Sequence, residues 1–206
     1  GPDTTIPPNE IVTLYLNGFT CPSKPVVSIN GIAVSWAVNV VGQVNILVPA
    51  GVVQPATLTI ACDGATAWSF SGLNTADVIP SVFTADGSGK GQGAILNSDN
   101  LQNGPSFPAS RGSWIVVYGT GFGALNAAGS NGLRTVAGTV KATIGGIDAE
   151  VMYAGTAPPM VEGLQQFNIR IPSGVTPGNA VPVVLTVNGT PTQTVTVAIR
   201  LSLIHI

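Results

Sequence analysis

Residues 163–175, Gly-Leu-Gln-Gln-Phe-Asn-Ile-Arg-Ile-Pro-Ser-Gly-Val, decide the fold because their pattern occurs twice in the chain. Residues 41–52 read Val-Gly-Gln-Val-Asn-Ile-Leu-Val-Pro-Ala-Gly-Val. In both copies Gln, an apolar residue and Asn lead through apolar residues into Pro, a small residue, Gly and Val. Proline has no backbone N–H to donate to a ladder, so it ends a strand. The chain is therefore predicted to be a tandem repeat built on strands.

Neighbouring segments repeat in the same order. Residues 11–19 and 114–122 both place an aromatic residue four positions before Phe in a Gly-Phe pair. Residues 27–34 carry Asn-Gly between apolar runs, and residues 142–149 carry Gly-Gly at the matching place. Both dipeptides are signals for a tight β-hairpin turn. We therefore expect two strands flanking a turn in each copy.

The last strand pattern, residues 194–199, alternates threonine or alanine with larger apolar residues. Side chains in a strand point to opposite faces in turn, so Val195, Val197 and Ile199 are predicted to be buried. No amphipathic helix of useful length is present. Short strands at regular spacing with turn signals between them predict an all-β chain of two antiparallel β-sandwiches.

The composition supports two small extracellular domains. The chain has 206 residues, of which 45% are hydrophobic and only 8% are charged, against about 25% charged in typical soluble domains. We interpret this low charge as typical of a secreted protein. A net charge of −2 gives no electrostatic reason to bind nucleic acid or an anionic membrane. No apolar run reaches the ~20 residues of a membrane span, and residues 1–3 do not resemble a signal peptide, so export is an inference.

Both cysteines, Cys21 and Cys62, lie in the first repeat. A disulfide between them is the favoured interpretation, because β domains outside the cell often carry such a link. The alternative is two separate buried thiols. Two cysteines without a nearby histidine do not make a zinc site.

The domain boundaries follow from the repeat. Residues 1–78 are predicted to form the first sandwich and residues 79–200 the second. The join, residues 79–97, contains short apolar pieces that indicate a hairpin belonging to the second domain rather than a free linker. Residues 103–109 are predicted to form a surface loop.

Several motifs resemble a known family, the uncharacterised and usually C-terminal repeat of large secreted proteins of Solibacter-type Acidobacteria. The resemblance covers most of residues 80–200 and is carried by residues 91–97, 108–123, 144–146, 153–155 and 166–174. The chain also resembles, more distantly, the immunoglobulin-like domains of plexins and some transcription factors. The resemblance implies tandem immunoglobulin-like β-sandwiches without catalytic activity on a secreted or surface protein, and it supplies no binding residues.

The tail departs from that family after Arg200. Residues 201–206, Leu-Ser-Leu-Ile-His-Ile, match what a common sequencing-library adaptor encodes when translated, so we interpret them as read-through. A genuine apolar strand extension is the alternative. If the tail is read-through, the only histidine, His205, is not native. The chain would then have no histidine for serine–histidine or cysteine–histidine catalysis, or for most zinc and iron sites.

Three polar patterns are weak candidates for chemistry. Residues 87–91, Gly-Ser-Gly-Lys-Gly, suggest a phosphate loop but lack the Ser or Thr after Lys and the following helix. Asp148 and Glu150 lie two apart on an expected strand and point to one side, although a solvent-facing strand also explains them. Loop oxygens could bind calcium, but their spacing does not match a calcium loop; they belong to Asp86, Asn97, Asp99, Asn100 and Asn103. Neither a cofactor nor a metal is expected.

Aromatic residues are the remaining candidates for binding. A flat sugar platform would use Trp36, Trp68, Trp114 or Tyr153, because aromatic faces bury the apolar faces of sugars. Trp114 matches a core position of the first repeat, so Trp68 and then Trp36 are the preferred ligand-binding residues.

The sequence thus favours a non-catalytic structural or adhesive extracellular module. Its expected partners are the other domains of a larger protein and a surface polysaccharide or protein. The alternative is a carbohydrate-binding accessory domain of a secreted polysaccharide-active enzyme. An enzyme in its own right is the third and weakest reading.

Overall fold

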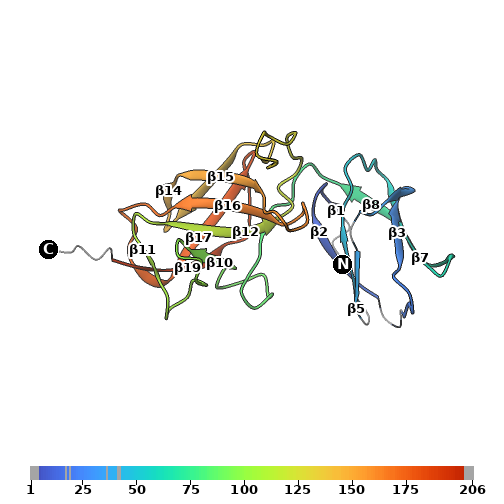
Figure 1. Cartoon of the computed structure of the whole chain (residues 1–206), viewed down its shortest axis with the longest axis horizontal. Coiled ribbons are helices and arrows are strands. Elements are labelled where there is room, and N and C mark those ends of the chain that lie inside the picture. The colour runs from blue at the N-terminus through green and yellow to red at the C-terminus, as the bar shows by residue number, and fades with distance from the viewer. Residues whose placement is uncertain (1–4, 17, 19, 36, 41–42, 202–206) are drawn as a thin grey trace. The chain divides into compact units, whose positions relative to one another are not determined.

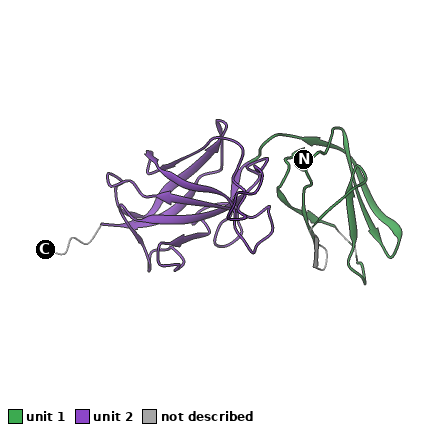
Figure 2. Ribbon diagram, turned by 45° about the horizontal axis from the view of Figure 1, so that its top comes forward, with its two compact units in different colours: residues 1–79 green, residues 80–206 purple. Residues whose placement is uncertain are grey.

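The computed structural model describes residues 5–16, 18, 20–35, 37–40 and 43–201. Every regular element in these ranges is a β-strand. The chain divides into two compact units, residues 1–79 and 80–206 (Figure 2). Each unit contains two sheets, so the predicted class, all-β with two tandem immunoglobulin-like sandwiches, is confirmed. None of the described residues forms a helix that could cross a membrane.

Unit 1 is built from a five-stranded and a three-stranded sheet. Their orders are β1-β8-β7-β3-β4 and β2-β6-β5. The strands are β1 (Thr5–Ile6), β2 (Ile11–Tyr15), β3 (Val26–Ile29), β4 (Ile32–Ala33), β5 (Ala37–Val40), β6 (Gln43–Leu47), β7 (Ala56–Cys62) and β8 (Ala65–Thr75). All pairings are antiparallel except that of β1, which runs parallel to β8.

Unit 2 repeats this plan and adds to it. Its larger sheet has the order β11-β19-β17-β13-β14 with β18 beside β17, and its other sheet has the order β10-β12-β16-β15 with β9 beside β12. Figure 1 labels β12, β16 and β15 of the second sheet side by side. The strands are β9 (Ser81–Val82), β10 (Ile95–Asn97), β11 (Ala109–Ser110), β12 (Trp114–Thr120), β13 (Val140–Ile144), β14 (Ile147–Ala149), β15 (Val151–Thr156), β16 (Gln165–Arg170), β17 (Gly178–Val187), β18 (Thr190–Pro191) and β19 (Val195–Arg200).

The two units share strand register as well as strand order. Tyr15 pairs with Gln43 in unit 1, and Tyr118 pairs with Gln166 in unit 2. The repeated Gln-x-Asn motif also makes the same contact in both: Gln43 Nε2 donates to Asn45 Oδ1 at 2.7 Å, and Gln166 Nε2 donates to Asn168 Oδ1 at 2.9 Å. The motif that predicts the repeat is therefore a framework contact of the smaller sheet.

The cores lie between the paired sheets. In unit 1 the buried cluster joins residues of both sheets, including Ile29 and Ile60 from one and Ile46 from the other. In unit 2 the predicted inward positions of the last strand are confirmed, since Val195 and Val197 are fully buried and Ile199 nearly so. Each such side chain stabilises the folded state by about 1.5–3 kcal/mol through transfer from water.

The predicted hairpin turns are also confirmed. Asn30 and Gly31 join β3 to β4 with φ values of 50° and 77°, and Gly145 and Gly146 join β13 to β14 with 62° and 77°. Two successive residues with positive φ are the signature of the type I′ turn, whose twist matches that of the flanking strands.

The join between the repeats forms a hairpin within unit 2. Ala94 N donates to Phe83 O at 2.7 Å, and Ala85 N donates to Gln92 O at 2.9 Å. The two ends of this hairpin are β9 and β10, and both pair antiparallel with the same edge of β12. This hairpin is the main addition of unit 2 to the shared plan.

Candidate functional site

A groove of about 590 Å³ opens in unit 1 between β2 and β8. Apolar side chains from both sheets line it, among them Val12 and Leu14 of β2 and Phe70 and Leu73 of β8. Glu10 is the one charged residue among the described residues of its lining. The groove is thus an apolar slot at the side of the sandwich, where the inward faces of the two sheets are not fully covered.

Trp68 lies in this groove. It is partly buried, and its ring stacks on Phe70 with centroids 6.0 Å apart and planes 8° from parallel. Both residues sit on the inward face of β8, because they alternate with exposed serines at positions 69 and 71. A ligand in the groove would contact these two rings on β8 and the apolar side chains of β2.

The other aromatic candidates are Trp36, Trp114 and Tyr153. Trp36 lies outside the described residues. Trp114 and Tyr153 belong to unit 2, and both are partly buried. Tyr153 Oη donates to Thr156 O at 2.7 Å, so this hydroxyl serves the local backbone.

Phe70 is a groove residue that the sequence analysis missed. The signal was available in Trp-Ser-Phe-Ser at residues 68–71, whose strict alternation places Trp68 and Phe70 on one face of a strand. The sequence also does not show that β2 forms the facing wall of the groove, because β2 and β8 lie far apart in the chain.

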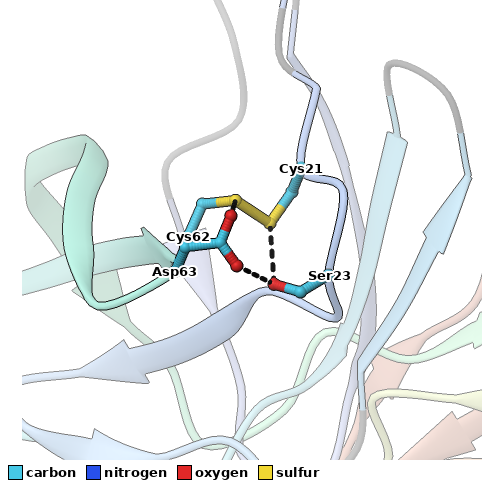
Figure 3. Close-up of a disulfide and its surroundings, with 4 residues drawn as sticks. All are labelled: Cys21, Ser23, Cys62 and Asp63. Atoms are coloured by element: carbon cyan, nitrogen blue, oxygen red, sulfur yellow. Dashed lines mark hydrogen bonds between the residues drawn. A yellow bond between two sulfur atoms is a disulfide. The ribbon is translucent and has the colours of Figure 1, made fainter.

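Cys21 and Cys62 are joined by a disulfide that closes a sequence separation of 41 residues (Figure 3). The bond connects the loop before β3 to the end of β7. Ser23 Oγ donates to Asp63 Oδ1 at 2.6 Å beside it, so a charged hydrogen bond joins the same two segments. This region is a structural clamp, and Asp63 with Gly64 forms the turn between β7 and β8.

The candidate phosphate loop, residues 87–91, is a turn whose polar groups hydrogen-bond to one another, to Asp86 and to Thr84. Asp86 Oδ1 accepts hydrogen bonds from Ser88 N at 3.0 Å and from Ser88 Oγ at 2.8 Å, and Gly89 N donates to Thr84 Oγ1 at 2.9 Å. The Ser88 backbone and hydroxyl bonds lower the pKa of Asp86. A phosphate cradle needs its amides free and positively polarised. Here the four amides of residues 87–90 all donate within the turn, and the Asp86 carboxylate lies beside them.

Asp148 lies on β14 and Glu150 directly follows that strand, and both side chains are exposed. Glu150 Oε2 accepts from Arg170 Nε at 2.9 Å, and Asp148 is exposed on the outward face of β14. This geometry provides an ion pair at the surface rather than two carboxylates facing one substrate.

Two of the residues suggested for calcium, Asn97 and Asn103, use their side-chain oxygens inside the fold. Asn103 Nδ2 donates to Asn97 Oδ1 at 2.8 Å and to Ala198 O at 2.9 Å, while its Oδ1 accepts from Ala198 N at 2.8 Å. Asn97 Nδ2 in turn donates to Phe107 O at 2.7 Å. These asparagines hold the loop of residues 98–108 onto β19. Among the described residues no cluster of three or more His, Cys, Asp or Glu side chains has metal-site geometry.

Comparison with known proteins identifies no family: no family model matches the chain, and no curated protein matches it. Three solved structures align over nearly the whole chain. The I9–I11 tandem from titin is 13% identical with a TM-score of 0.29 over 96% of this chain and 63% of that one. SGBP-B from a complex xyloglucan utilization locus in Bacteroides uniformis is 13% identical with a TM-score of 0.34, over 94% and 48%.

The tandem Ig repeats of Dlar are 11% identical with a TM-score of 0.23, over 96% of this chain and 93% of that one. The chain thus spans about two thirds and about half of the lengths of the first two structures. At these scores the assignment of two immunoglobulin-like sandwiches rests on the strand order and register described above.

Proposed function

We propose that the chain is a non-catalytic structural or adhesive module of a larger extracellular protein. Its direct partners are the other domains of that protein, and its loops and grooves make any contact with a surface polysaccharide or protein. The observation that supports this best is how its polar side chains are used. The Gln-x-Asn pairs, Asn97, Asn103 and Asp86 all bind other parts of the fold.

The groove of unit 1 supports the same proposal. Catalytic pockets combine an apolar wall with a few convergent polar groups and titratable residues of shifted pKa. The groove of unit 1 has the wall, with Glu10 as its one charged lining residue in the described part of the chain. Such a groove can hold an apolar ligand, but it offers no acid–base pair for a reaction.

The disulfide supports the extracellular assignment. Disulfides persist in oxidising compartments and are rare where the cytosol keeps thiols reduced. The Cys21–Cys62 bond connects two segments 41 residues apart in sequence, which is the kind of link that small secreted domains use. Together with the low charge of the chain, the disulfide supports a location outside the cytosol.

The test is a turnover screen of the purified oxidised chain against chromogenic esters, glycosides, phosphates and peptides. We expect rates equal to those of a heat-denatured blank. Turnover that follows the chain through two orthogonal columns and disappears on denaturation would contradict the proposal. Near-ultraviolet circular dichroism of the same preparation would show that lack of turnover is measured on folded protein.

Carbohydrate binding is the second candidate because Trp68 and Phe70 present parallel rings in an open groove. The apolar lining argues against it, since sugar sites need hydrogen-bond partners for hydroxyl groups as well as a stacking face. Affinity electrophoresis in gels containing soluble polysaccharides distinguishes the two. A carbohydrate site in the groove predicts retardation that Trp68→Ala abolishes and the matched control Trp114→Ala preserves. The structural or adhesive proposal predicts that Trp68→Ala leaves the mobility in these gels unchanged.

A further inference from the structure

The groove of unit 1 occupies the place that a strand fills in unit 2. In unit 2 the segment 91–97 crosses from one sheet edge to the other. Gly93 N donates to Thr196 O at 2.9 Å and Thr196 N donates to Gly91 O at 2.7 Å on the β19 side. The same segment then forms β10, which pairs antiparallel with β12. It closes the side of the sandwich between β19 and β12.

Strand register locates the equivalent positions in unit 1. On β12, Val117 pairs with Phe167 of β16. On β2, Leu14 pairs with Val44 of β6, which holds the same place in the Gln-x-Asn motif as Phe167. Leu14 therefore corresponds to Val117. Val195 pairs with Val183 on β17 as Phe70 pairs with Leu58 on β7. Phe70 of β8 therefore corresponds to Val195 of β19. Leu14 and Phe70 both belong to the lining of the groove, one on each of the two sheets.

The degree of burial at these positions differs between the units. Val117 and Val195 are fully buried, and Ile95 of β10, the register partner of Val117, is fully buried with them. Leu14 and Phe70 are only partly buried. Among the described residues, β2 pairs with β6 alone. Unit 1 thus has the two sheet edges and the apolar walls of this position, while none of its described strands lies in it.

We propose that this groove binds an extended polypeptide strand that adds antiparallel to β2 and places a branched apolar side chain between Leu14 and Phe70. The occupant is an extended segment of a partner polypeptide that carries the small-then-apolar pattern of Gly93-Ala94-Ile95. The second unit provides the argument for this occupant, because it shows the same position of the same framework filled by such a strand.

The chemistry of the groove fits a strand better than a sugar or a compact ligand. An edge strand presents a row of backbone N–H and C=O groups that an added strand can pair with. Recognition by strand addition takes its affinity from main-chain hydrogen bonds and its specificity from pockets for alternate side chains. The apolar slot beside β2 supplies such a pocket. This inference goes beyond the proposed structural role and does not require it.

The test uses the full oxidised chain and a fluorescein-labelled peptide with the sequence of residues 90–99, measured by fluorescence anisotropy. We expect saturable binding of this peptide, and at least ten-fold weaker binding of the same peptide carrying the I95D change. Amide chemical-shift changes on binding should concentrate at β2 and β8. The I95D peptide leaves the protein unaltered, so its weaker binding cannot come from misfolding.

Two chain variants test the edge itself. Thr13 corresponds by register to Val116, the partner of Leu96 in β10. Thr13→Pro removes the backbone N–H at this position, and edge strands accept proline, so peptide binding should fall at least ten-fold. Thr13→Val keeps the N–H and gives the side chain of unit 2, so binding should be retained. Both variants would be compared with the parent chain by near-ultraviolet circular dichroism.

The proposal is overturned if the wild-type peptide shows no saturation at millimolar concentration, or if the I95D peptide binds equally well. Equal binding by folded Thr13→Pro would also overturn strand addition at β2. Shifts at Trp68 and Phe70 produced by an oligosaccharide but not by the peptide would assign the groove to sugar. Concentration-dependent dimerisation that the peptide cannot compete would assign it to a second copy of the chain.

Discussion

At the scale of single residues, glycines at matching positions of the repeat mark where the backbone must turn. Gly18 and Gly121 precede the phenylalanine of the repeated Gly-Phe pair, and their φ values are +75° and +77°. L-residues rarely adopt this conformation, which costs about 1–3 kcal/mol and more for a β-branched side chain. We predict that Gly121→Val lowers the free energy of unfolding of unit 2 by about 1–3 kcal/mol in urea denaturation.

The matched control for this prediction is Gly104→Val. Gly104 lies in a loop of the same unit, its φ is not in the left-handed range, and a Cβ atom there would meet nothing within 4 Å. We expect the control to stay within about 0.5 kcal/mol of the parent, as surface substitutions usually do. Equal effects at both positions would show that the left-handed conformation of Gly121 is not what matters.

A second residue-scale prediction concerns Asp86. Its pKa is lowered mainly by the hydrogen bond from the backbone of Ser88 and then by the bond from the Ser88 hydroxyl. A carboxyl group with a lowered folded-state pKa stabilises the fold at pH values above its unfolded pKa, and this contribution is lost as the pH falls through the folded pKa. Carbon-detected NMR titration should give a midpoint for Asp86 below that of an unstructured aspartate. Ser88→Ala should raise it only in part, since the backbone donor remains.

Residue identity alone could not separate binding residues from framework residues. Asn97 and Asn103 in a polar loop look the same in sequence whether their oxygens hold a cation or the backbone of β19, because the distinguishing partner, Ala198, lies 95 positions from Asn103. Trp68 was a ligand-binding candidate from the sequence, and the structure shows it, partly buried, in the lining of the groove. Its neighbour Phe70 became a candidate only once both rings were seen on one face of β8.

At the scale of elements, the hydrophobic pattern predicted those strands that are long or that end at a characteristic turn. The Asn-Gly and Gly-Gly hairpins and the alternation of residues 194–199 are examples, since turn chemistry and period two are local properties. The two-residue strands β1 and β11, which pair parallel with β8 and β19, were not predicted. Two residues have no measurable period, and a parallel partner far along the chain leaves no local trace.

The loop that follows β10 gives a prediction at this scale. Asn103 is 2% exposed and makes two hydrogen bonds with the backbone of Ala198. Its truncation leaves a buried N–H and a buried C=O unpaired, each costing about 1–3 kcal/mol. We predict that Asn103→Ala lowers the stability of unit 2 by about 2–4 kcal/mol and accelerates amide hydrogen exchange in β10 before the rest of the sheet.

Gln102→Ala is the control for this element, because residue 102 adjoins Asn103 and is exposed. Its stability and its exchange rates in β10 should match those of the parent chain. If Asn103→Ala instead accelerated exchange uniformly across unit 2, the asparagine would act on the whole sandwich and not as the local anchor of this loop.

At the scale of the whole molecule, one sandwich carries a covalent link and the other does not. Both cysteines lie in unit 1, where their disulfide encloses a separation of 41 residues. Unit 2 instead has the additional β9–β10 hairpin against β12. A compact domain can in general unfold by itself, so the two units are expected to respond differently when the chain is pulled and the disulfide is reduced.

Single-molecule stretching of the chain between handles at its two ends tests this expectation. We predict two unfolding events, one for each unit. With the disulfide intact, the enclosed residues cannot extend, so reduction should lengthen the extension gained by unit 1 by about 140 Å at ~3.5 Å per residue. The event of unit 2, which contains no cysteine, serves as the internal control and should keep its extension. The double variant Cys21→Ser, Cys62→Ser should reproduce the reduced behaviour without reductant. A single event, or an equal change in both, would contradict a module of two separately folded sandwiches with one covalent clamp.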